Sequence, residues 1–176
     1  MVKYSWNAIN SKFAYSQVMG KKLTLYFDTS VFNFAFADDT PDRKTITLKL
    51  IDDVKTNKYD VYISEVVLRE IREAQREKAR KLMNLINEIQ PFELKFDSEC
   101  YELAYEYVKR GIIPNKYEDD AFHIAVASVN DLDAIISWNF KHIVKLKTKK
   151  EVSGTNLLMG YKEIEIYSPM EVIEND

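Results

Sequence analysis

The sequence predicts an α/β protein in which a central, mainly parallel sheet of about five strands lies between helices on both faces. Two observations support this prediction. Short apolar runs typical of buried strands alternate along the chain with longer segments of helical period. The 176 residues, which include only four glycines and four prolines, have the length of one ordinary domain. Strands separated by helices form parallel sheets, because each crossover helix returns the chain to the same edge.

The first predicted strand covers residues 23–27, which are apolar apart from one threonine, and it stops at Asp28. A short apolar segment follows at 31–36. Thr40–Pro41 then looks like the N-cap and the first residue of a helix, because proline at that position loses no hydrogen bond. Apolar residues behind it predict that this helix continues to about Val54.

The middle of the chain predicts two more strands and two helices. Residues 60–63 form the second predicted strand, and a long charged helix is expected at about 64–88, with a break near Lys78. Residues 92–96 alternate with a period of two and predict a third strand. The next helix covers about 98–111 and ends in a glycine, which suits the left-handed position that follows a helix.

The last predicted elements are a helix at 119–130 and strands at 133–137 and 162–167. The domain is expected to span residues 21–176. Residues 1–20 precede it as an N-terminal extension, for which a partner-contacting helix and a flexible arm are both open.

Composition excludes some classes of protein. No run approaches the roughly 18 apolar residues of a membrane span, and the N-terminus lacks the apolar core of a secretory signal. The cytoplasm is therefore the expected compartment. The net charge of −3 is not the positive excess of a typical nucleic-acid binder. Acids gathered at a metal site lower the total charge, however, while local basic patches can still steer a polyanion.

Four polar residues are expected to meet at one edge of the sheet. Asp28 follows the first strand, Glu70 lies about two turns into the helix after the second strand, Asp120 is in the first turn of the helix at 119–130, and Asn139 follows the fourth strand. Ligands of parallel sheets bind outside the carboxyl ends of the strands. Converging carboxylates need a cation, and oxygen ligands favour Mg²⁺ or Mn²⁺.

Each of these residues also has a purely structural explanation. Asp28 can cap the helix that follows it. Glu70 can be a solvated helix acid, and Asp120 can be an acid favoured by the helix dipole. Asn139 can simply end a strand. Spacing alone does not choose between these roles and a metal site.

Four segments in this order resemble the PIN-domain family, and most of all the VapC-like toxins of toxin–antitoxin pairs. They are YFDTSV at 26–31, ISEVVLREI at 63–71, DAFHIA at 120–125 and ISWNF at 136–140. The resemblance covers roughly residues 23–172. The Asp-Thr-Ser and Asp-Ala-x-His-x-Ala boxes are fairly specific together, whereas either alone is weak.

The resemblance implies a Rossmann-like, three-layer PIN fold and a Mg²⁺- or Mn²⁺-dependent endoribonuclease. Asp28, Glu70 and Asp120 match the family's acidic metal ligands, and Ser30 matches a hydroxyl that supports the site. Asn139 stands where the family usually has a fourth acid, which puts a second metal in doubt. The resemblance also implies an RNA substrate, a cognate antitoxin that blocks the site, and a homodimer. Bound metal would lower the pKa of an attacking water.

Other polar residues have weaker links to the site. Asp133 is the alternative fourth acid, but it begins its strand and so belongs at the opposite end of the sheet. His123 shares a helix face with Asp120, where it is either a partner of that acid or a hydrogen-bonded core residue. His142 is a phosphate contact or a solvated residue. Further candidates for RNA or partner contact are a basic stripe at Arg69, Arg72, Arg76 and Arg80, a lysine run at Lys145, Lys147, Lys149 and Lys150, and the aromatics Phe32, Phe34 and Phe36.

Two other functions compete with the nuclease. A phosphatase of the haloacid dehalogenase type also has an aspartate at the end of an early strand. It requires a second aspartate two residues later, where this chain has Ser30. The non-enzyme alternative is a PIN-like module that binds RNA or a protein without cleaving, and Asn139 is the residue that favours it.

Overall fold

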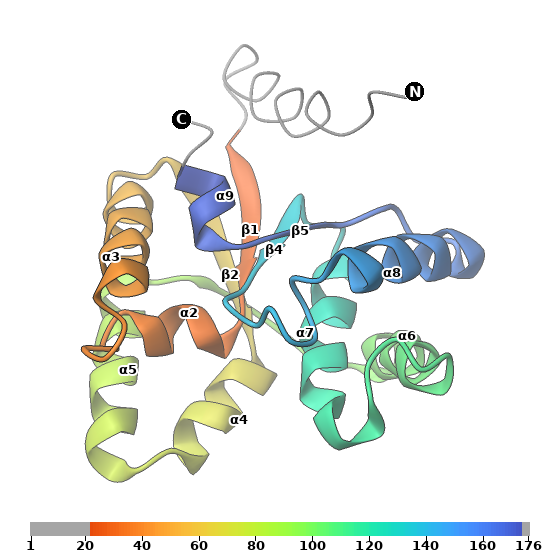
Figure 1. Ribbon diagram of the computed structural model, residues 1–176, viewed down its shortest axis with the longest axis horizontal. Coiled ribbons are helices and arrows are strands. Elements are labelled where there is room, and N and C mark those ends of the chain that lie inside the picture. The colour runs from red at the N-terminus through yellow and green to blue at the C-terminus, as the bar shows by residue number, and fades with distance from the viewer. Residues whose placement is uncertain (1–21, 174–176) are drawn as a thin grey trace.

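A computed structural model describes residues 22–173, so the predicted extension at 1–20 lies outside the described residues. These residues form a five-stranded sheet with helices on both faces (Figure 1). The elements are, in chain order, β1 (Leu23–Phe27), α2 (Thr29–Phe34), α3 (Pro41–Lys55), β2 (Tyr59–Ser64), α4 (Glu65–Glu73), α5 (Arg76–Ile89), β3 (Phe92–Leu94), α6 (Ser98–Lys109), the short 3₁₀ helix η1 (Asn115–Tyr117), α7 (Glu118–Val129), β4 (Ala134–Ile136), α8 (Leu146–Met159), β5 (Glu165–Tyr167) and α9 (Pro169–Ile173).

The sheet has the strand order β3-β2-β1-β4-β5, and every neighbouring pair is parallel. The first strand of the described residues, β1, is central in the sheet: Leu25 pairs with Val61 of β2 on one side and with Ala134 of β4 on the other. Successive strands first extend the sheet past β2 and then reverse to the β4 side. This reversal leaves a crevice between the carboxyl ends of β1 and β4, where ligands bind in such sheets.

Two helical layers enclose the sheet. In Figure 1, α2, α3 and α5 cover one face, and α6, α7 and α8 cover the other. Both faces of the central strands are therefore buried, which explains the continuous apolar run of β1: Leu25, Tyr26 and Phe27 are all inaccessible to solvent. No helix among residues 22–173 is long and apolar enough to cross a membrane.

Several predicted boundaries are confirmed. The first strand has the predicted bounds, 23–27, and α3 begins at Pro41. Gly111 follows the end of α6 in the left-handed region, with φ +71°. Thr40 is the N-cap residue of α3, but its side chain makes no capping hydrogen bond.

The long helix is broken, as predicted, but the break lies at residues 74–75 and not at Lys78. Helix α4 ends at Glu73, Ala74 and Gln75 are extended, and Lys78 lies inside α5. No helix-breaking residue marks the break, because alanine is a strong helix former. Its cause is tertiary. The two extended residues redirect the chain so that the apolar faces of both α4 and α5 are buried.

Helices α8 and α9 were not predicted. The buried residues of α8 are Thr148, Val152, Thr155 and Asn156, so the face that packs on the core is mostly polar. Asn156 explains how such a face is accommodated: it accepts from the Tyr107 hydroxyl and donates to Ser128 Oγ at 3.0 Å.

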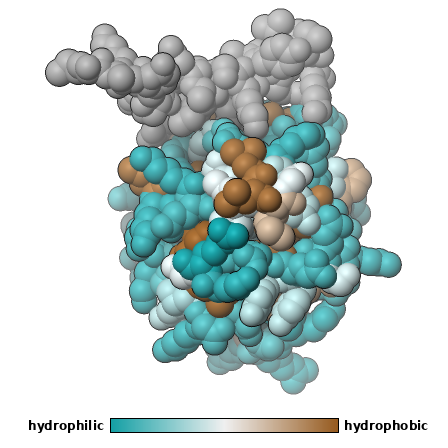
Figure 2. All heavy atoms as spheres, turned by 90° about the vertical axis from the view of Figure 1, so that its right-hand side faces the viewer, coloured by the Kyte–Doolittle hydropathy of each residue, from teal (hydrophilic) through white to brown (hydrophobic). Residues whose placement is uncertain are grey.

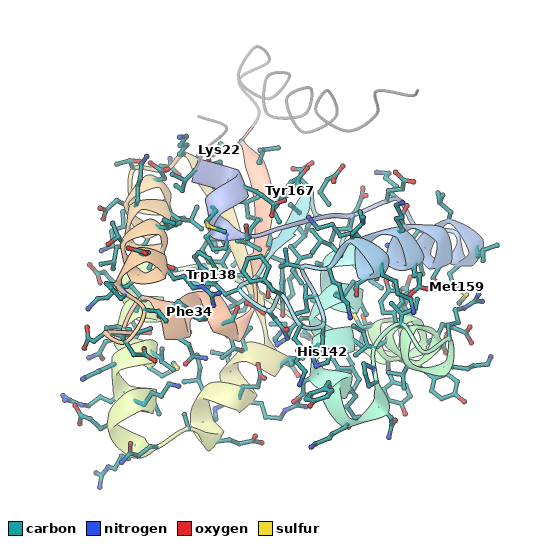
Figure 3. All side chains as sticks on the ribbon, in the orientation of Figure 1. Lys22, Phe34, Trp138, His142, Met159 and Tyr167 are labelled. Atoms are coloured by element: carbon teal, nitrogen blue, oxygen red, sulfur yellow. The ribbon has the colours of Figure 1, made fainter. Side chains whose placement is uncertain are left out.

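Trp138 attaches the loop after β4 to helices α2 and α3. Its indole Nε1 donates to Thr47 Oγ1 at 2.9 Å, and its ring packs against Phe34, with centroids 5.4 Å apart (Figure 3). The Arg43 guanidinium lies over both rings. The residues on either side of Trp138 are thereby held at the crevice.

We expect Asn156→Ala to lower the free energy of unfolding by about 2–3 kcal/mol, because it removes the hydrogen bonds of Asn156 to the buried Tyr107 and Ser128. Leu157→Ala, on the exposed face of the same helix, is the control and should cost less than about 0.5 kcal/mol. Urea denaturation measures both. Equal costs would mean that the buried polar contacts do not stabilise the fold.

Candidate active site

Asp28 lies at the carboxyl end of β1 and is almost completely buried. One carboxylate oxygen accepts the backbone N–H groups of Ser30 and Val31, at 3.1 and 3.4 Å, and so caps α2. The same oxygen accepts the Ser30 hydroxyl, while the other accepts the Ser137 hydroxyl at 2.6 Å. The capping role proposed for Asp28 is confirmed, and the carboxylate still faces the crevice.

Two serine hydroxyls join the ends of β1 and β4. Ser30 Oγ accepts the backbone N–H of Trp138 at 2.8 Å, and Ser137 Oγ accepts that of Asn139 at 2.9 Å. Both hydroxyls also donate to Asp28, so each one connects the loop after β4 to this carboxylate.

Glu70 projects from α4 toward Asp28 and is not in bulk solvent. Its Oε2 accepts the Thr29 hydroxyl and bonds His123 Nε2 at 2.9 Å. Ser64 caps α4 by accepting the Val66 N–H at 3.2 Å, and this fixes where the helix begins. The geometry excludes the interpretation of Glu70 as a solvated helix acid.

His123 connects Glu70 to the core through a buried chain of hydrogen bonds. Its Nδ1 lies 2.9 Å from the Tyr26 hydroxyl, which lies 2.7 Å from Ser64 Oγ. His123 is thus both a core histidine and the partner of an acid, although that acid is Glu70 and not its helix neighbour Asp120.

Asp120 lies in the first turn of α7, opposite the loop after β4. Its Oδ1 accepts Asn139 Nδ2 at 2.9 Å, whereas its Oδ2 is buried and has no hydrogen-bond partner among the described residues. Asn139 Oδ1 in turn accepts the backbone N–H of His142 at 3.0 Å. Asn139 therefore bridges its own loop and Asp120, and does more than end a strand.

These side chains line one pocket of about 300 Å³. Each of the three acids comes from a different element: the end of β1, helix α4 and helix α7. The residues that line the pocket are Asp28, Thr29, Ser30, Asn33, Glu70, Ala74, Lys78, Leu82, Asp120, His123 and Asn139.

The charges in the pocket are only partly balanced. Burial disfavours both ionised forms in the Glu70–His123 pair, but their mutual bond outweighs it, so the pKa of Glu70 is lowered and that of His123 is raised. Burial raises the pKa of Asp28 against the opposing effects of His123, Ser137 and Ser30. Burial, with the charge of Asp28, raises the pKa of Asp120 to about 6. Two carboxyl groups therefore lack a full countercharge.

The residues present fit a hard divalent cation by their chemistry. They offer carboxylate oxygens, including the unpartnered Oδ2 of Asp120, and two acids whose ionised forms a cation would stabilise. Among residues 22–173, no three histidine, cysteine or acidic side chains stand together as a ready-made metal-binding group. Hydroxyl, amide and imidazole donors hold Asp28 Oδ2, Glu70 Oε2 and Asp120 Oδ1 instead.

The structure separates the remaining candidates from the pocket. Asp133 accepts the backbone N–H of Thr24 at 2.9 Å at the start of β1, so it lies at the opposite end of the sheet, as predicted. The basic stripe is wrong as one continuous helix face, because the break after Glu73 divides it between α4 and α5. In the lysine run, Lys149 pairs with Glu171 at 3.2 Å.

His142 and two of the three phenylalanines also have structural roles. The His142 ring lies against Tyr117, with centroids 4.1 Å apart. Phe32 belongs to the core and Phe34 packs on Trp138, whereas Phe36 remains exposed.

Sequence analysis missed three residues that build the site. Thr29 and Ser137 bond the acids directly, and both lie inside the motifs that carried the family resemblance. Hydroxyls beside strand ends were the available signal. Tyr26, which bonds His123, gave no signal because it looks like one more apolar residue of β1.

The comparisons agree with this architecture. Neither the protein-family models nor the curated proteins include a match to the sequence. Two crystal structures are similar in fold. The first is VapBC2 from Rickettsia felis bound to a DNA fragment from the promoter, with 15% identity, a TM-score of 0.55 and coverage of 83% of this chain and 98% of the other. The second is DNA-bound VapBC from Salmonella typhimurium, with 17% identity, a TM-score of 0.50 and coverage of 84% of this chain and 98% of the other.

These likenesses establish the class of fold: the chain is a three-layer α/β protein of the PIN type. Within that class, the fold is VapC-like, as the four sequence motifs predicted.

Asp120→Asn tests the charge balance of the pocket. The pKa of Asp120 rises from 3.8 to about 6 on folding. Its destabilising effect is therefore absent below pH 4, grows between pH 4 and pH 6, and is complete above pH 6. A pKa shift of this size, reduced for partial exposure, corresponds to about 1–3 kcal/mol in the free energy of unfolding. In EDTA the variant should therefore melt several degrees above the parent at pH 8 and level with it near pH 4. A variant that melts below the parent at pH 8 would show that the Asp120 anion stabilises the fold.

Proposed function

We propose that this chain is a metal-dependent endoribonuclease. It would hydrolyse RNA phosphodiester bonds with Mg²⁺ or Mn²⁺. One observation carries the proposal: Asp28, Glu70 and Asp120, from three separate elements, line the same pocket at the reversal of strand order. The buried, unpartnered oxygen of Asp120 supports it, because a structural acid would have its bonds satisfied.

Asp28, Glu70 and Asp120 would hold the ion. Bound Mg²⁺ or Mn²⁺ would lower the pKa of an attacking water and neutralise charge that develops on the phosphate. The protein's own groups keep the acids in place: Ser30 and Ser137 orient Asp28, and His123 orients Glu70.

We also propose a cognate antitoxin protein that blocks the pocket, and a homodimer. The antitoxin proposal is supported by the similarity of fold to VapBC complexes. The far end of α8 offers a surface for either partner: Leu157, Leu158 and Met159 are exposed there. Figure 2 views this side of the molecule and shows an apolar patch on a mostly hydrophilic face.

The alternative is a PIN-like module that binds RNA or a protein without cleaving it. Asn139 favours this function, because its amide already occupies one oxygen of Asp120. The two functions differ in a single measurable property, which is metal-dependent cleavage.

We expect the protein to cleave single-stranded or structured RNA with Mg²⁺ or Mn²⁺, and not in EDTA. Asp28→Asn, Glu70→Gln and Asp120→Asn should each reduce the rate at least a hundredfold, because each removes a charge from the ion's ligands. Asp119→Asn is the matched control: this neighbouring acid pairs with Arg69 on the surface, and its variant should retain the parent's rate. Cleavage is measured on labelled RNA in gels. Loss of activity in the control as well, or no cleavage by the parent, would contradict the proposal.

Asn139→Asp should strengthen Mn²⁺ binding, because it adds a fourth acid to the ligand set. Without metal, the same change should lower the melting temperature, since the new carboxylate faces Asp120 where an amide now donates a hydrogen bond. Calorimetric titration with Mn²⁺ and melting in EDTA measure the two effects. If Mn²⁺ binds the variant no more tightly than the parent, residue 139 does not face the ion.

A further inference from the structure

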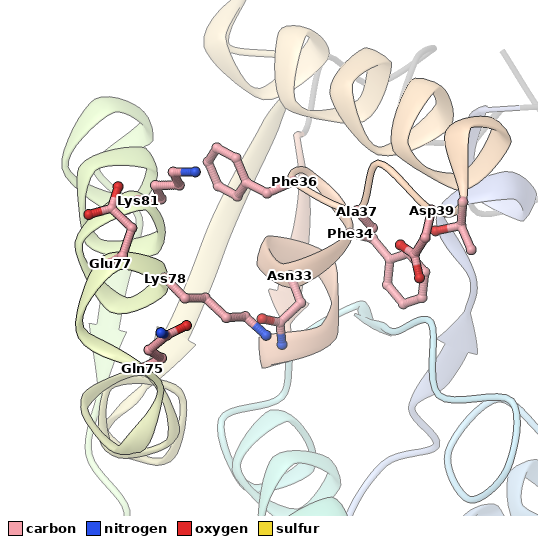
Figure 4. A pocket seen from close by; sticks show the side chains of 10 residues that line it. Asn33, Phe34, Phe36, Ala37, Asp39, Gln75, Glu77, Lys78 and Lys81 are labelled. Carbon is pink, nitrogen blue, oxygen red and sulfur yellow. The ribbon is translucent and has the colours of Figure 1, made fainter.

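A second, larger groove adjoins the acidic pocket. It has a volume of about 510 Å³, within the ~300–1,000 Å³ range of ligand sites, and runs between α5 and the connection from α2 to α3 (Figure 4). Asn33 and Lys78 line both the groove and the acidic pocket. A chain-like ligand seated on the acids can therefore continue into the groove.

Lys78 is the one exposed cation that lines the acidic pocket within residues 22–173. Figure 4 shows its side chain extending from α5 toward Asn33, the other residue that lines both cavities. Neither Lys78 nor Lys81, the second lysine of the groove, forms an ion pair among the described residues. Lys44, Lys55 and Lys109, by comparison, are paired with carboxylates.

An exposed aromatic ring faces the lysines. Phe36 is 42% exposed, although its neighbours Phe32 and Phe34 are packed, and Figure 4 shows it directed toward Lys81. Asn33 adds a polar group: its Oδ1 is buried and has no hydrogen-bond partner in the described part of the chain. The groove thus combines cations, a free ring face and an unused acceptor.

Neither acid of the groove pairs with Lys78, although the charge of Lys81 acts on Glu77. Glu77 is bonded to Arg80 at 2.9 Å. Asp39 is drawn in Figure 4 beside Phe34, away from Phe36 and Lys78. The part of the groove nearest the acidic pocket is therefore its positive part.

We infer that this groove binds the nucleotides that flank the scissile phosphate of a single-stranded RNA, an inference that rests on the proposed nuclease function. Lys78 contacts the first flanking phosphate and offsets the repulsion of the three carboxylates. Phe36 stacks on a base, and Asn33 accepts a hydrogen bond from a base or a 2′-hydroxyl. Backbone cations combined with an aromatic platform are how proteins hold single strands without strict sequence preference.

The test is binding of a fluorescein-labelled, single-stranded 12-nucleotide RNA in EDTA, followed by anisotropy over a range of salt concentrations. Lys78→Gln should weaken binding and reduce the slope of log K against log salt by about 0.7, the value of one phosphate contact on a single strand. Lys81→Gln should act in the same direction. Phe36→Ser should weaken binding roughly five- to hundredfold with an unchanged slope, because stacking is not ionic. Lys49→Gln, an exposed lysine of α3 outside both cavities, is the matched control and should bind like the parent.

The inference is overturned if Lys78→Gln and Phe36→Ser bind RNA like the parent, which would leave the groove to a protein partner. It is equally overturned if Lys49→Gln weakens binding as much as Lys78→Gln, or if the parent binds no RNA. Because the assay contains no metal, it is independent of cleavage. If the parent cleaves RNA and the groove variants bind it normally, only the RNA-binding role of the groove is refuted. If RNA binding depends on the groove but the parent does not cleave RNA, only the proposed nuclease function is refuted.

Discussion

The buried Asp28 carboxylate is the group on which the arrangement of the site depends. A buried anion is stable only when donors surround it, and here they are the first amides of α2 and two serine hydroxyls. This requirement fixes the direction in which α2 leaves the sheet, and it joins the ends of β1 and β4 where the strand order reverses. Helix capping and a place in the pocket looked like alternatives in the sequence. The same carboxylate does both.

The pocket supplies an imidazole partner for one acid and not for the other two. His123 pairs with Glu70, and the Tyr26 hydroxyl orients the ring from behind. Asp28 and Asp120 have raised pKa values because burial, together with the charges of neighbouring acids, is not compensated to the same degree. An added cation would therefore gain most from contact with these two acids, while Glu70 is already held in place at the edge of the pocket.

The sequence was sufficient for the strands and the acids but not for the details between them. Apolar runs that end in a polar residue located β1 and Asp28, because both faces of a central parallel strand are buried. Helix α8 could not be found in this way, since polar residues such as Asn156 form its buried face. The break after Glu73 and the position of Lys78 between two cavities depend on packing between helices, which no local pattern records.

Asn139 shows how the site balances folding against charge. Its amide donates to Asp120 and accepts from the loop at His142, while its backbone N–H binds Ser137. An aspartate could keep the second and third of these contacts but would turn the first into repulsion between two acids. The amide therefore holds the loop after β4 close to Asp120 without an ion. A chain built in this way keeps its pocket assembled before any cation arrives, at the expense of one charge that would attract the cation.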